Sequence, residues 1–225
     1  MCSRSIRAIL TIAALALAAP SAMPVPPVDV GALARAVDDH HNRLKSLKAD
    51  FTEIYQGPGV SRTESGVLWL KKPGKMRWEY HQPKEKLFLS DSKAAYFYVP
   101  SERQVRRMAI KDLDDVRSPL RFLLGKTKLE KELELLSLAP DVTPLESGDT
   151  VLRGIPKYMK DRIADVLLEI TPGHQIRRIV LQGVDGTLTD FHFTHIEDDA
   201  RMSDTLFRFT PPAGVEVISG AQPTQ

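Results

Sequence analysis

The chain has 225 residues, with 31 Lys and Arg against 29 Asp and Glu and a single cysteine. A balance so close to neutral argues against a nucleic-acid binder or a basic membrane-surface protein. The length suits one domain with a full-sized hydrophobic core.

The first residues are typical of a secretory signal peptide. Arg4 and Arg7 precede an apolar run at 8–19 that is too short to span a bilayer, and small residues after it offer cleavage sites. A buried core helix is the alternative, but nothing amphipathic follows directly. We therefore expect 1–22 to be a signal peptide and 23–225 to form a single exported domain.

The same cleavage changes the charge and cysteine counts. Removing Arg4 and Arg7 leaves 29 basic residues against 29 acidic ones. Cys2 lies before the apolar run rather than at its end, so cleavage removes it and leaves no lipid-attachment site, disulfide or thiol.

Helical periodicity follows a Pro-rich leader. Apolar or aromatic side chains recur at steps of three and four residues, at Val30, Leu33, Val37, His41, Leu44 and Leu47. This spacing predicts an N-terminal helix, which is followed by a predicted strand at 49–56.

The next part of the chain alternates as strands do. Short runs with regular spacing predict an antiparallel meander, with Pro73-Gly74 in one of the turns. The runs lie at 65–71, 75–81, 85–91 and 93–99, with a further candidate at 103–110.

The pattern changes after residue 110. Residues 118–125 predict a short apolar helix, 128–140 a helix or strand, and 140–160 a polar insertion. Four closing strands are predicted at 164–171, 175–183, 186–197 and 204–212. The fold class is thus mainly β with helices, with roughly ten strands in all.

Residues with catalytic or metal-binding potential are scarce. No nucleophile, phosphate-loop or dinucleotide motif is present, and the only cysteine lies in the predicted signal. His192 and His195 are three apart in a predicted strand, so they point to opposite faces. We expect no catalytic residues, no metal and no cofactor.

Several predicted strands are apolar on both faces. Residues 67–70, 87–89, 96–99 and 166–168 have no polar side, whereas an antiparallel strand usually has one dry and one wet face. A sheet that is closed on itself and packed against helices explains this without a ligand. A cavity for an apolar ligand explains it equally well.

The stretch GVLWLKKPGKMRWEYHQPKEKLFLSDSKAAYFYVP combines a Gly-x-Leu strand, a basic-Pro turn, an aromatic strand, a Ser-Asp turn and a second aromatic strand, and a later segment reads LFRFTPPAGVEVI. In these two segments the chain resembles the LolA family, the periplasmic outer-membrane lipoprotein carriers. The family pattern has Ser-Asp-Gly at the turn and Phe-x-Phe-x-Pro-Pro-x-Gly-Val at the end. Two positions depart from the family pattern, because Lys72 stands where Arg is common and Ser92 where Gly is usual.

The resemblance implies an unclosed antiparallel β-barrel of ten to eleven strands, with a helical lid over a hydrophobic cavity. Val67 and Trp69 would lie on its outer face. The lipid-binding cavity would be lined by Phe51, Leu68, Leu70, Met76, Trp78, Tyr80, Phe88, Tyr96 and Tyr98. The lid would contain Leu120, Phe122, Leu123 and Leu124, and Lys72 would take the place of the family's arginine latch, although an ammonium lacks its forked contacts.

The function implied by the resemblance is transport rather than catalysis. The protein would be a periplasmic monomer that takes acylated lipoproteins from an inner-membrane ABC-type releasing complex and yields them to an outer-membrane lipoprotein acceptor. The alternatives are a LolA-like carrier of free lipid or glycolipid, an interaction module that senses lipidated proteins, and an exported hydrolase.

Overall fold

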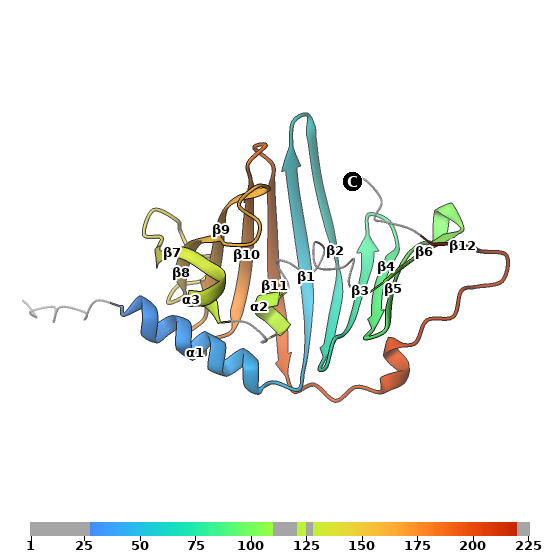
Figure 1. Cartoon of the computed structure of the whole chain (residues 1–225), viewed down its shortest axis with the longest axis horizontal. Helices are drawn as coiled ribbons and strands as arrows, with labels where there is room; N and C mark the ends of the chain where they lie inside the picture. Colours follow the sequence, from blue (N-terminus) through green and yellow to red (C-terminus); the bar gives the residue numbers. More distant parts are fainter. Residues whose placement is uncertain (1–27, 110–120, 125–127, 220–225) are drawn as a thin grey trace, which may run out of the picture.

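A single twelve-stranded sheet dominates the computed structural model, which describes residues 28–109, 121–124 and 128–219 (Figure 1). The predicted signal peptide lies outside these residues. The strands are β1 Ser46–Gly57, β2 Val60–Lys71, β3 Lys75–Gln82, β4 Lys86–Asp91, β5 Ala94–Val99, β6 Gln104–Ala109, β7 Leu133–Leu138, β8 Thr150–Pro156, β9 Ile163–Ile170, β10 Ile176–Gly183, β11 Leu188–Asp198 and β12 Glu216–Ser219. The helices are α1 Val30–Arg43, α2 Arg121–Leu124 and α3 Leu129–Glu132, with 3-10 turns η1 Pro100–Glu102 and η3 Asp204–Phe207.

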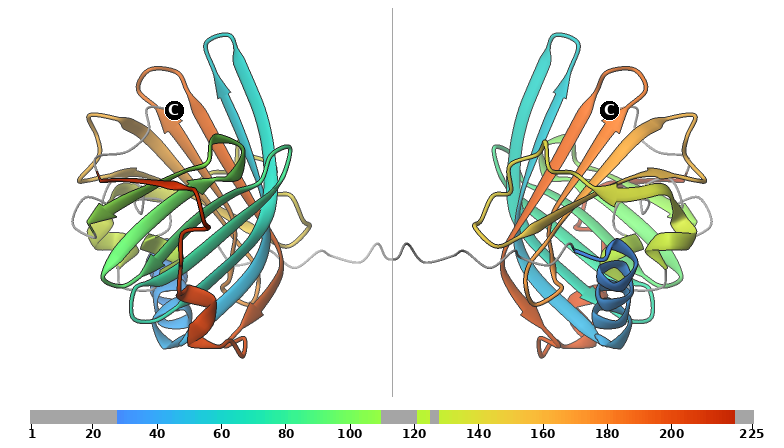
Figure 2. Two further views of the ribbon diagram at one scale, coloured as in Figure 1. Left: turned by 90° about the vertical axis from the view of Figure 1, so that its right-hand side faces the viewer. Right: turned by 90° about the vertical axis from the view of Figure 1, so that its left-hand side faces the viewer.

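The strand order is β12-β6-β5-β4-β3-β2-β1-β11-β10-β9-β8-β7. Two meanders therefore meet where β1 pairs with β11, and every pair is antiparallel except β12 with β6. The sheet curves strongly, and its edge strands β7 and β12 are not paired with each other (Figure 2). The prediction of an unclosed antiparallel barrel is confirmed, with twelve strands rather than ten to eleven.

Helix α1 lies across the concave side of the sheet, together with α2 and α3 (Figures 1 and 2). Its first turn is capped by Asp29, whose side chain accepts a hydrogen bond from the Ala32 N–H at 3.0 Å. Ala34 and Val37 bury their side chains in the core of the molecule.

The predicted N-terminal helix is too long. Helix α1 ends at Arg43, and Leu44 is already extended with a ψ of 137°. Leu47 belongs to β1, where it pairs with Leu70 on one side and Asp198 on the other. The backbone hydrogen bonds of two neighbouring strands outweigh the helical spacing of the side chains.

Two further predictions for the second half need correction. The polar segment 140–160 contains β8, which pairs with β7 and β9. The strand predicted at 204–212 is instead the 3-10 turn η3, capped by the Ser203 side chain, which accepts from the Thr205 N–H. The segment predicted as helix or strand at 128–140 forms both, α3 followed by β7.

Candidate functional site

The concave face of β1 to β4 carries a continuous apolar surface. The register places Leu68 opposite Trp78 and Trp78 opposite Phe88, so these side chains point to the same side. The residues predicted to line a cavity that lie on this face are Phe51, Leu68, Leu70, Met76, Trp78, Tyr80 and Phe88. All of them are buried except Tyr80, which is half-buried.

Trp78 lies at the centre of an aromatic cluster on this face. Its ring centroid is 4.6 Å from Phe51, 6.4 Å from Tyr80, 5.8 Å from Phe191 and 6.4 Å from Phe193. Most of these pairs are edge-to-face, the arrangement that aromatic quadrupoles favour.

Phe191 and Phe193 come from β11 and were absent from the residues predicted from sequence. Their alternation with Asp190 and His192 was a usable signal, because it predicts one apolar and one polar face. The sequence did not link these two residues to the cluster, because β11 is remote from β1 in sequence but adjacent to it in the sheet.

Tyr96 and Tyr98 lie on the opposite, convex face, so their predicted place in the cavity is wrong. Their rings contact Phe209, at centroid distances of 5.3 and 5.8 Å. Phe97 is the β5 aromatic on the concave face, because it pairs with Phe88 and packs against the main core. In the run Tyr-Phe-Tyr-Val every residue is apolar or aromatic, so alternation alone could not choose the face.

Short helices cover the apolar face. Phe122 and Leu123 of α2 are buried in the same core as the strand residues. Of the other predicted lid residues, Leu120 lies outside the described residues, and Leu124 is the last residue of α2. α1 contacts both α2 and α3, so the three helices form one cover.

Lys72 joins the sheet to the end of α1. Its Nζ donates to the carbonyl oxygens of His41 and Asn42, at 2.6 and 3.1 Å. The last carbonyls of a helix lack partners within the helix and carry partial negative charge, so an ammonium group stabilises them.

His41 belongs to the last turn of α1, and its side chain is buried. Its Nε2 accepts a hydrogen bond from the Ile176 N–H at 3.3 Å, and its side chain is 1% exposed. Burial lowers the pKa of His41 to about 3, and the nearby His40 and Lys72 lower it as well. His41 is therefore a neutral acceptor in the folded protein.

A polar cluster borders the aromatic residues on the concave face. Glu53 and Glu64 face each other across β1 and β2, and both are buried. The Tyr80 hydroxyl donates to Glu53 at 2.9 Å, while Lys86 Nζ donates to Glu64 at 2.7 Å and lies over the Tyr80 ring. Burial raises the pKa of the Glu53 carboxyl, and the Tyr80 hydrogen bond opposes this effect.

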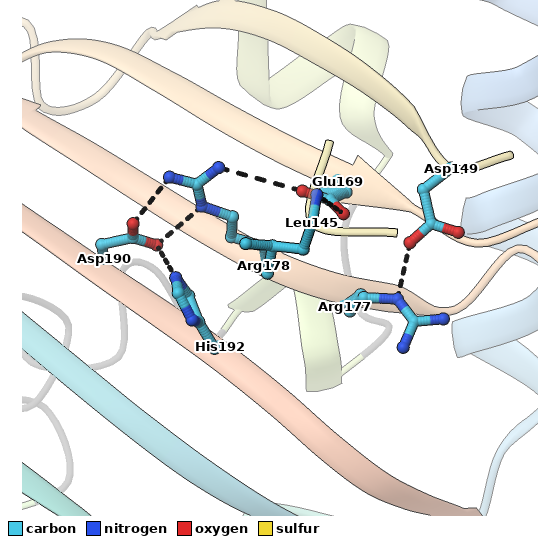
Figure 3. A network of polar contacts seen from close by, with 7 residues as sticks. All are labelled: Leu145, Asp149, Glu169, Arg177, Arg178, Asp190 and His192. Carbon is cyan, nitrogen blue, oxygen red and sulfur yellow. Dashed lines mark hydrogen bonds and ion pairs between the residues drawn. The ribbon is translucent and has the colours of Figure 1, made fainter. Parts of the chain in front are cut away.

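The convex face of β9 to β11 carries a separate polar network (Figure 3). Arg178 donates two hydrogen bonds to Asp190, at 2.9 and 2.7 Å, and lies 3.9 Å from Glu169. Glu169 accepts the Leu145 N–H at 2.7 Å, which holds the loop before β8 against the sheet. Burial raises the pKa of Glu169, and nothing in this arrangement resembles a nucleophile and its base.

Two features are absent from the described residues. They contain no group of three or more His, Cys, Asp or Glu side chains that could hold a metal ion. They also contain no helix that is long and apolar enough to cross a membrane.

Comparison with known proteins gives a consistent result. Residues 42–210 match the family model described as "Outer membrane lipoprotein carrier protein LolA". The chain is 30% identical over 179 residues to an outer-membrane lipoprotein carrier protein of Nitrosospira multiformis, covering 78% of this chain and 83% of the relative. A protein of the same name from Dechloromonas aromatica is 31% identical over 191 residues, covering 82% and 88%.

A solved structure has the same fold. The lipoprotein LppX of Mycobacterium tuberculosis superimposes with a TM-score of 0.51 at 13% identity, over 77% of this chain and 97% of that chain. With its unclosed sheet, its helices over an apolar concave face and a family match over residues 42–210, this chain belongs to the LolA family.

Proposed function

We propose that this protein is a periplasmic carrier that binds the acyl chains of lipoproteins against the concave face of its sheet. It receives them from an ABC-type releasing complex of the inner membrane and delivers them to an outer-membrane acceptor. The observation that carries the proposal is the apolar surface around Trp78, which is covered by α1 and by two helices of only four residues each, α2 and α3. The predicted signal peptide supports export to the periplasm.

The energetics require such a surface. Each CH₂ of an acyl chain exposed to water costs about 0.8 kcal/mol, and three chains carry on the order of forty such groups. A carrier that offers another apolar environment makes transfer nearly neutral, so small differences in affinity set its direction.

Uptake exchanges one set of apolar contacts for another. The helices leave the concave face, and acyl chains take their place against the aromatic cluster. Lys72 acts as a latch in this scheme, because its hydrogen bonds to His41 and Asn42 hold the end of α1 on the sheet.

Neighbouring residues on opposite faces of β5 allow a matched crosslinking test. Phe97 packs on the concave core and Tyr96 contacts Phe209 on the convex face. Each position in turn receives the photocrosslinker benzoylphenylalanine, and the protein is mixed with a diacylated lipopeptide or the same peptide without acyl chains. Crosslinking from position 97, with the lipidated peptide only, is the expected result. Equal or stronger crosslinking from position 96 would contradict the proposed face.

Material bound in the native periplasm distinguishes the remaining alternatives. Mass spectrometry of the purified protein should find lipid-modified polypeptides. Free lipid or glycolipid alone would show a general lipid carrier, and a protein with neither would favour a sheet filled by its own side chains.

A further inference from the structure

We propose that the indole N–H of Trp78 is a hydrogen-bond donor for the cargo, and that its acceptor is the ester carbonyl oxygen that links an acyl chain to glycerol. This inference rests on the proposed function, since it assumes that acyl chains enter the concave face. It adds a polar contact at the centre of the aromatic cluster.

Among the described residues, the indole nitrogen of Trp78 has no hydrogen-bond partner. The side chain is 3% exposed, and its Nε1 is buried without a hydrogen bond in the part of the chain that the structure describes. Buried donors are nearly always paired, and a buried tryptophan N–H usually finds an acceptor. An indole N–H can only donate, so the missing partner must be an acceptor.

The aromatic rings around Trp78 supply no such acceptor. The rings of Phe51, Phe191 and Phe193 surround it, and they have no polar atom. The Tyr80 hydroxyl is already engaged with Glu53 at 2.9 Å. A phenylalanine at position 78 would suit these apolar neighbours without leaving a donor unpaired.

An acyl ester has the chemistry that this position lacks. Its hydrocarbon chain suits the aromatic cluster, and its carbonyl oxygen is a neutral acceptor that carries no charge into the site. A free carboxylate suits it less well, because the buried acids Glu53 and Glu64 lie on the same face. Leaving the donor unpaired penalises the closed state, and pairing it with the ester favours the loaded one.

The indole proton itself can report the contact. The chain contains two tryptophans, Trp69 and Trp78, and Trp69 pairs with Arg77 at a position of the other face. In the Trp69→Phe variant a single indole N–H resonance remains in a proton–nitrogen correlation spectrum. Two synthetic probes are added in turn: a lipopeptide with two ester-linked acyl chains on a glyceryl-cysteine, and its dialkyl ether analogue.

We expect the Trp78 indole proton to move downfield with the ester probe and not with the ether probe. Saturable binding of both probes with the same shift, or with no shift, would overturn the inference while leaving the proposed function standing. Failure of both probes to bind would refute the proposed function instead. A downfield shift with phosphatidylglycerol, but no binding of either lipopeptide, would keep the ester contact and make free lipid the cargo.

A near-isosteric replacement tests the energy of the contact. In the Trp69→Phe background, biosynthetic incorporation of the benzothiophene analogue of tryptophan replaces the N–H at position 78 by sulfur and preserves the ring shape. Affinity for the ester probe should fall about tenfold, the value of one net hydrogen bond, and affinity for the ether probe should not change. An equal loss for both probes would show that the substitution acts through packing and would contradict the proposed contact.

Discussion

At the scale of single residues, Gly66 decides how closely the concave aromatics can pack. It pairs with Phe51 on one side and Tyr80 on the other, and those rings meet across it at 4.9 Å. A Cβ at this position would lie 1.7 Å from the carbonyl oxygen of Glu79, so no side chain fits unless the backbone moves.

Gly66→Ala should therefore destabilise the protein by roughly 3 kcal/mol or more. The measurement is the free energy of unfolding in urea. Gly173→Ala is the matched control, because a Cβ there meets only the Thr171 hydroxyl at 3.7 Å, and it should change stability little. Equal effects of the two substitutions would show that steric overlap at Gly66 is relieved without cost.

Ser92 has a strained backbone conformation. Its φ of 77° lies in the left-handed region, which favours glycine. Its Oγ donates to the Pro73 carbonyl at 2.6 Å, which offsets part of the backbone strain.

Two substitutions separate these effects at Ser92. Ser92→Ala loses the hydrogen bond and keeps the strain, whereas Ser92→Gly loses the bond and relieves the strain. We expect the glycine variant to be more stable than the alanine variant by about 1 kcal/mol in thermal or urea unfolding. The reverse order would mean that the strain at position 92 is negligible.

At the scale of elements, the side chains of a strand could be assigned to its two faces from the sequence where one of those faces is polar. In β3, Arg77 and Glu79 separate Met76, Trp78 and Tyr80, so alternation placed these three on one face, and they lie together at the concave core. In β5 both faces are covered, and alternation carries no information. The long-range pairing of β1 with β11, which completes the aromatic cluster, depends on the topology of the whole sheet.

The end of α1 should be sensitive to pH through His41. An unfolded chain binds a proton there below about pH 6.5, but the folded protein binds it only near pH 3. The contribution of His41 to the free energy of unfolding is therefore fully present above pH 6.5 and is lost as the pH falls towards 3.

His41→Gln keeps an acceptor for the Ile176 N–H and removes the titration. The wild type should lose on the order of 2 kcal/mol relative to this variant between pH 7 and pH 5, measured as free energies of unfolding. Parallel pH profiles of the two proteins would contradict a buried neutral His41.

Lys72 should determine how firmly α1 stays on the sheet. Lys72→Met removes the donor to His41 and Asn42 and should cost about 2 kcal/mol of stability, because the lost hydrogen bonds involve a charged group. Amide hydrogen exchange in the last turn of α1 should accelerate. Lys72→Arg retains a cationic donor and should exchange more slowly than the methionine variant; identical exchange would mean that Lys72 does not hold the helix.

At the scale of the whole molecule, the sheet has two covered faces. Asp204 binds Lys71 and Lys75 at 2.7 and 2.9 Å, and these ammonium groups lower the pKa of Asp204 to about 2. Phe207 is 1% exposed on this convex side and lies outside the concave core. The sequence did not reveal that this segment covers the convex face, because the alternating aromatic residues at 206–209 are typical of a strand.

Phe207→Ala separates stability from binding. The loss of a buried aromatic should destabilise the protein by about 3–5 kcal/mol. Lipopeptide crosslinking from position 97, measured where the variant is still folded, should stay unchanged, because Phe207 and Phe97 lie on opposite faces. A parallel loss of crosslinking would show that the two faces are coupled through the sheet.

The unpaired edges of the sheet have a mechanical consequence. A closed barrel has its radius set by strand number and stagger, so it can widen only by breaking a row of backbone hydrogen bonds. Here β7 and β12 end the sheet without joining. The curvature can relax by small changes of twist between neighbouring strands, with all eleven strand pairings intact. The concave face of such a sheet can therefore become wider or narrower, and can fit ligands of different width, without loss of strand pairing.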